Sequence, residues 1–129
     1  MQWENLDPPS SKLGATGIRV GGQVLDLRHD FRFIALNFGA EEHSLTLGWI
    51  TLEHRLGAAS GLAMVFSEVN LFEAAFAEPE AAGELDRWEL RLDPDPVLIF
   101  FFAYGTIRVA AESVRAELIE NEADAEPVQ

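Results

Sequence analysis

Hydrophobic and polar residues alternate with a period of two along most of the chain, which is the pattern of half-buried β-strands. Two neighbouring segments, 32–38 and 43–49, show it most clearly and are separated by a short polar turn. The alternation places Ile34, Leu36 and Phe38 on one face of the first segment, and Leu45, Leu47 and Trp49 on one face of the second. Both are rich in β-branched and aromatic residues. We therefore predict an antiparallel hairpin.

The same alternation predicts further strands. Residues 17–20 and 23–28 flank Gly21-Gly22, a pair that can adopt the positive φ angles of a two-residue hairpin turn. Residues 97–104 are apolar at nearly every position, which is typical of a central strand covered on both faces. Additional alternating segments cover residues 62–66, 88–92 and 106–110.

Two segments fit more than one element. In residues 69–76, Val69, Phe72 and Phe76 have helical spacing, but the segment is only two turns long, so strand and short helix are equally compatible. Residues 111–119 suit a helix by composition and a strand by alternation. A bulge near Glu112-Ser113 would let one long strand switch faces there. We favour the strand because no stop signal separates this segment from the strand before it.

These elements predict a mainly β fold of about seven or eight strands, arranged as an antiparallel sandwich or open barrel. An α+β fold with one or two short helices is the alternative. The length of 129 residues indicates a single globular domain, which we place at 1–119 with an irregular segment at 1–16. Residues 120–129 are acidic and offer little to bury, so they predict a disordered tail.

The excess of acidic residues narrows the classes of molecule that the protein is expected to bind. The chain has 22 Asp and Glu against 9 Lys and Arg, a formal net charge of −13. Nucleic-acid binding is therefore not expected, because phosphate contacts come from basic side chains. The absence of cysteine excludes disulfides and zinc-thiolate or iron–sulfur sites. No cofactor is expected.

Membrane association is also not expected. The longest apolar run, 97–104, is far shorter than the roughly 20 residues of a membrane-spanning helix. The first residues lack both the basic and the apolar region of a signal peptide. We therefore expect a soluble, cytoplasmic protein.

Acidic residues are concentrated in 68–95 and in 112–126. Acidic side chains on a surface ordinarily serve solvation, but a local negative field also attracts a basic partner. We expect an acidic binding face in the first of these stretches. Its candidate residues are Glu68, Glu73, Glu78, Glu80, Glu84 and Asp86.

Two other groups of residues are candidates. His29, His43 and His54 each have acidic neighbours and are weak candidates for a metal or acid–base role, although their spacing matches no metal motif. Phe100, Phe101 and Phe102 must send at least one ring to each face of a strand. A face left uncovered would need a second subunit, so these residues form a candidate homodimer patch.

No catalytic motif is present: there is no nucleophile elbow and no phosphate-binding glycine loop. Residues 29–49, 65–69 and 105–110 together resemble a loose group of small acidic β-rich bacterial proteins of unknown function. Some members of that group are immunity proteins of polymorphic toxin systems, and the resemblance implies no catalytic residues. We expect a non-catalytic protein-interaction module, immunity-like, that binds a basic partner. The alternative is a small-molecule-binding protein, or a metal- or histidine-dependent enzyme, with a pocket in the β-domain.

Overall fold

The computed structural model describes residues 1–52 and 59–120. Within this part of the chain nine strands and two short 3-10 turns follow one another. They are β1 (Gln2–Glu4), η1 (Ser11–Leu13), β2 (Gly17–Val20), β3 (Gln23–Asp26), β4 (Phe31–Gly39), β5 (Ser44–Thr51), β6 (Ala59–Ala74), η2 (Pro79–Ala82), β7 (Leu85–Arg91), β8 (Val97–Phe102) and β9 (Gly105–Glu120).

Seven strands form one sheet, in which six follow the order β4-β5-β6-β9-β8-β7 and the seventh, β1, also pairs with β9. All neighbours are antiparallel except β1, which lies parallel to β9. β2 and β3 form a separate antiparallel hairpin. The predicted mainly β, antiparallel fold is confirmed. The large sheet is not closed into a barrel, because its end strands β4 and β7 do not pair with each other.

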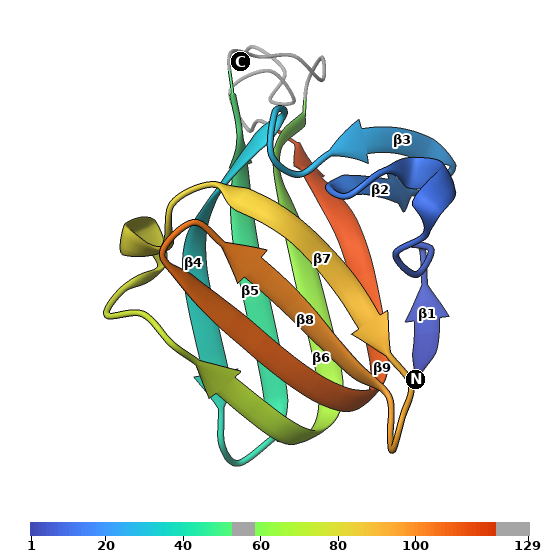
Figure 1. Ribbon diagram of the computed structural model, residues 1–129, viewed down its shortest axis with the longest axis vertical. Coiled ribbons are helices and arrows are strands. Elements are labelled where there is room, and N and C mark those ends of the chain that lie inside the picture. The colour runs from blue at the N-terminus through green and yellow to red at the C-terminus, as the bar shows by residue number, and fades with distance from the viewer. Residues whose placement is uncertain (53–58, 121–129) are drawn as a thin grey trace, which may run out of the picture.

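β6 and β9 are the longest strands, and both bend midway (Figure 1). The first half of β6 pairs with β5, and the first half of β9 pairs with β8. Along β9 the buried positions change from Ile107, Val109 and Ala111 to Val114 and Ala116, so the strand switches faces at 112–113 as predicted. The bulge expected there is absent from β9: the extra residue lies in β6, between Val69 and Leu71, which pair with Ala111 and Ala110. Residues 111–119, one of the two ambiguous segments, are therefore strand throughout. In the other, 69–76, the strand ends at Ala74.

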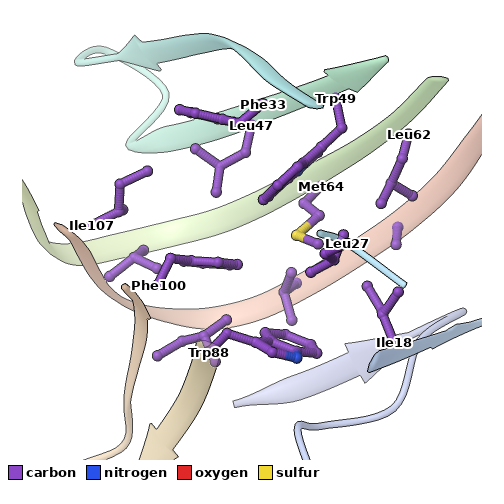
Figure 2. Packing of buried hydrophobic residues seen from close by; sticks show 14 of the residues in the cluster. Ile18, Leu27, Phe33, Leu47, Trp49, Leu62, Met64, Trp88, Phe100 and Ile107 are labelled. Carbon is purple, nitrogen blue, oxygen red and sulfur yellow. The ribbon is translucent and has the colours of Figure 1, made fainter. Parts of the chain in front are cut away.

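This bend folds the sheet onto itself, so that β7 and β8 cross in front of β4 and β5 (Figure 1). The core lies between these two layers, where large side chains from both sides point toward one another (Figure 2). The ring centres of Phe33 in β4 and Phe102 in β8 are 5.0 Å apart, and those of Trp49 in β5 and Phe100 in β8 are 6.2 Å apart. Burial of this apolar surface is the main source of stability.

The β2–β3 hairpin covers one end of the core. Gly21 and Gly22 have φ angles of 57° and 83°, as the predicted two-residue turn requires. Ile18 of β2 is fully buried and Leu27, just after β3, nearly so. The hairpin is held to β7 through Trp88, whose indole Nε1 donates to the carbonyl oxygen of Gly17 at 2.9 Å.

Three details differ from the predictions or lie beyond them. Leu36 and Phe38 pair with buried Leu47 and Leu45, but Ile34 does not share their face, because a bulge at this position turns Phe33 into the core instead. Within the segment expected to be irregular, residues 2–4 form β1. The expected acidic tail lies outside the described residues except for Glu120, which ends β9.

Candidate functional site

The six acids of the predicted binding face differ in their surroundings. Arg28 lies against two of them, with its guanidinium 3.1 Å from the Glu84 carboxylate and 3.8 Å from that of Asp86. Glu73 pairs with Arg108 at 3.1 Å on the neighbouring strand. Three of the six acids thus have an arginine partner, although two of them share Arg28. Glu78 and Glu80 lie at η2 and are exposed, and Glu68 lies apart from the others, at the bend of β6.

The backbone around Glu68 has an unusual conformation. Glu68 has a φ of 54°, which non-glycine residues adopt only at a cost, and His43 in the β4–β5 turn has a φ of 50°. The two segments are joined by a backbone hydrogen bond of 2.7 Å from the amide of Val69 to the carbonyl of His43. The bend of β6 is therefore tied to this turn, and the Glu68 side chain is left exposed beside it.

Glu112 lies at the same level of the adjacent strand. Ser67 pairs with Ser113 and Val69 pairs with Ala111, which brackets Glu68 and Glu112 between two aligned pairs. Both acids line two adjoining hollows of about 780 Å³ and 500 Å³, and Asp95 of the β7–β8 turn lines the larger. We call these hollows the corner groove. Its lining residues are Met1, Gln2, His43, Glu68, Val69, Asn70, Asp95, Pro96, Ala110, Ala111, Glu112 and Ser113.

The corner groove carries negative charge without a partner. Among the described residues, none of Glu68, Asp95 and Glu112 forms an ion pair, and no lysine or arginine lines the groove. No three histidine or acidic side chains in the described ranges are grouped closely enough to hold a metal ion. Spaced carboxylates of this kind suit several separate cationic groups, such as the arginine and lysine side chains of a polypeptide.

The histidines occupy different parts of the molecule. His29 lies in the β3–β4 turn and His43 in the β4–β5 turn, at opposite ends of the nine-residue strand β4 (Figure 1). At roughly 3.3 Å per residue, a strand of this length keeps them far apart. His54 lies outside the described residues. The structure therefore does not bring His29 and His43 into one site.

His29 instead belongs to a hydrogen-bonded turn built around Asp26. The Asp26 carboxylate accepts hydrogen bonds from Thr16 Oγ1 at 2.8 Å and from the backbone amides of Arg28 and His29 at 2.9 and 3.1 Å, and it lies 3.0 Å from His29 Nδ1. Burial alone would raise the pKa of Asp26, but the hydrogen bonds from His29, Thr16 and these amides hold its pKa below the ordinary value. The cluster stabilises the turn into β4.

The predicted homodimer patch is divided by the sheet. Phe100 and Phe102 point into the core, whereas Phe101 is half-buried on the outer face. The guanidinium carbon of Arg87 lies 3.9 Å from the centre of the Phe101 ring, in cation–π geometry. The protein thus covers part of this face itself, and the homodimer stays a prediction.

Comparison of the chain with protein-family models, with curated proteins and with solved structures finds no match. The resemblance to immunity-type proteins therefore stays a prediction. In the described part of the chain, no helix combines the length and apolar character needed to cross a membrane.

Proposed function

We propose that the protein is a non-catalytic interaction module that binds a basic protein partner through the corner groove. The observation that supports this most directly is the group of three carboxylates, Glu68, Asp95 and Glu112, around one hollow that no lysine or arginine of the described residues lines. Arginine side chains of a partner would form charge-assisted hydrogen bonds to these carboxylates.

The arrangement has an energetic consequence. Like charges at the same level of adjacent strands destabilise a sheet, and Glu68 adds a backbone conformation that is costly for a residue with a side chain. A bound cationic group would offset the repulsion between Glu68 and Glu112. The electrostatic energy of the groove is thus lower with a basic partner bound than without one.

The net charge of −13 supports rapid encounter with such a partner. A negative surface attracts positively charged proteins over about one Debye length, roughly 8 Å at physiological salt, and raises their rate of association. Acidic inhibitors bind basic nucleases in this way. We therefore propose an immunity-like role in the cytoplasm, in which the groove engages a basic toxin.

A titration with hexa-arginine, followed by ¹⁵N-resolved NMR, tests the location of the site. We expect saturable shifts of the backbone amides of Asn70, Glu112 and Ser113, and small shifts around Glu78 and Glu80. Hexa-glutamate, which has the same length and the opposite charge, serves as the control peptide. Shifts centred on η2, or spread evenly over all exposed acids, would contradict the proposal.

A further inference from the structure

One broad side of the large sheet points away from the core. Along β5 the buried residues Leu45, Leu47 and Trp49 alternate with half-buried ones, which therefore lie on the opposite side of the strand. The same alternation continues on the first half of β6 and on the second half of β9. In Figure 1 this side lies behind β4, β5 and β6, away from β7 and β8. We call it the back face.

The centre of the back face carries no charge. Its residues on β5 and β6 are Thr46, Gly48, Ile50, Gly61, Ala63 and Val65. Charged residues are depleted in this way at the centre of protein–protein interfaces. The charged residues that flank this centre on the described parts of the neighbouring strands have formal charges that cancel, and they are Arg32 of β4, Glu4 of β1, and Arg115 and Glu117 of β9. In a chain of net charge −13, the back face therefore lets a second copy approach without local repulsion.

The register of the strands arranges the back face in rows that run across the sheet. One row consists of Thr46, Val65 and Arg115, and the next consists of Gly48, Ala63 and Glu117. The first row carries the larger side chains and a positive charge, and the second carries smaller side chains and a negative charge. Neither Arg115 nor Glu117 forms an ion pair with another described residue.

We propose that two copies of the chain pack back face to back face around a two-fold axis. The axis runs across the strands, midway between the two rows, so that the first row of each copy faces the second row of the other. Arg115 then lies opposite Glu117 of the second copy, and Val65 lies opposite the second copy's Ala63. Because the contact is symmetric, each of these pairings forms twice.

Shape and charge both favour this arrangement. The larger side chains of one row fill the space above the smaller side chains of the other, as in the interior of a two-sheet sandwich. Each arginine meets a carboxylate that has no partner within its own chain, and charge-assisted hydrogen bonds of this kind are the stronger ones. Neither row includes a residue of the corner groove, so the two sites can be tested separately.

The area of the contact sets the strength of the dimer. With strands about 4.8 Å apart and rows about 6.7 Å apart, four strands and four rows bury roughly 1,000 Å² in the two copies together. Interfaces below about 1,200 Å² belong to weak, reversible complexes, so we expect a dissociation constant of about 0.1 mM. The protein is then a monomer at micromolar concentration and a dimer at millimolar concentration.

Sedimentation equilibrium from micromolar to millimolar concentration at physiological salt tests the dimer, and charge reversal tests the face. Arg115→Glu places two acids on β9, and Glu117→Arg places two bases there, so each variant alone opposes like charges across the axis. We expect either change to weaken dimerisation at least about tenfold. In an equimolar mixture of the two variants every opposed pair again has opposite charges, so the mixture is expected to dimerise at least as tightly as the parent.

The chain offers a matched control on β7. Glu89 and Arg91 have the same spacing along a strand and form an ion pair at 2.9 Å, far from the back face. Glu89→Arg and Arg91→Glu make the same changes of charge and are expected to leave dimerisation within about twofold of the parent, alone and mixed. A parent that stays monomeric at millimolar concentration would overturn the proposal. So would a dimer that persists unchanged in Arg115→Glu and Glu117→Arg, or a mixture of these two variants that stays monomeric.

Discussion

Glu68 and Glu112 lie at the same level of two adjacent strands, where the sheet bends, and no lysine or arginine of the described residues lines the hollow that they share. Other acids of β6 and β7 and the acid just before β7 have an arginine partner, as Glu73, Glu89 and Glu84 do. These two carboxylates therefore differ from the surrounding surface by their lack of a counter-charge.

Removing one of the two charges should stabilise the isolated protein. Glu112→Gln is expected to raise the free energy of unfolding by about 0.5 kcal/mol, because it ends a cross-strand repulsion between like charges. Urea denaturation at low salt measures the effect. At about 1 M salt, where the Debye length is about 3 Å, the gain should largely disappear. Glu117→Gln, an exposed acid further along β9, is the control. A Glu112→Gln protein that is less stable than the parent at low salt would contradict this interpretation.

The two buried tryptophans should respond differently to replacement by phenylalanine. Trp88→Phe leaves the Gly17 carbonyl without its indole donor, whereas the Nε1 of Trp49 has no partner to lose. Both changes replace a buried indole by a smaller ring, so the difference between the two losses of folding stability measures the contribution of the Trp88 hydrogen bond. We expect Trp88→Phe to cost about 1–2 kcal/mol more than Trp49→Phe in chemical denaturation. Equal losses would mean that the indole of Trp88 does not anchor the β2–β3 hairpin.

Asp26 should make the free energy of unfolding depend on pH. Its pKa is lowered in the folded protein, so its contribution is complete above the unfolded-state pKa of about 3.9 and is lost as the pH falls through the lower folded value. Asp26→Asn is expected to cost about 1 kcal/mol at neutral pH, a modest value because the side chain is 37% exposed. This difference from the parent should shrink below about pH 4.

Thermal or urea unfolding between neutral pH and about pH 3 measures this dependence. Asp93→Asn, an exposed acid in the β7–β8 turn, is the control and is expected to change stability at neutral pH by less than about 0.5 kcal/mol. A loss in Asp26→Asn that stays constant down to the lowest pH would contradict the assignment.

Arg87 should limit self-association through the outer face of β8. Because its guanidinium covers the Phe101 ring at 3.9 Å, Arg87→Ser is expected to expose apolar surface and to raise the average molar mass at high concentration. Light scattering over a concentration series measures this change. Arg91→Ser removes an exposed arginine paired with Glu89 and serves as the control. If both variants remain strictly monomeric, the predicted homodimer does not form through Phe101.

The fold was predictable where alternation is strict. Leu45, Leu47 and Trp49 are buried as their spacing predicts, because the pleat of a regular strand places every second side chain on one face. Ile34 breaks this rule because a bulge adds one residue to β4, and an apolar run contains no local sign of where that residue lies. The switch in β9 was predictable because Glu112 interrupts its alternation.

The site was less predictable, because it depends on contacts that are distant in sequence. Arg28 reaches Glu84 across 56 residues, and this pairing removes Glu84 from the predicted acidic face. Asp95 joins Glu68 and Glu112 because β8 pairs with β9: the pairing of Leu98 with Val109 places the turn that precedes β8 beside Glu112. A count of acids along the chain cannot distinguish neutralised carboxylates from unpaired ones.

The most direct test of the corner groove compares two triple variants of equal charge. Glu68→Gln, Asp95→Asn and Glu112→Gln together raise the net charge by three from −13, and so do Glu78→Gln, Glu80→Gln and Glu117→Gln. Calorimetric titration with hexa-arginine at physiological salt measures the affinity of each. We expect the groove variant to lose about tenfold in affinity and the control to stay within about twofold of the parent. Equal losses in the two variants would show that net charge alone governs binding and would contradict the account.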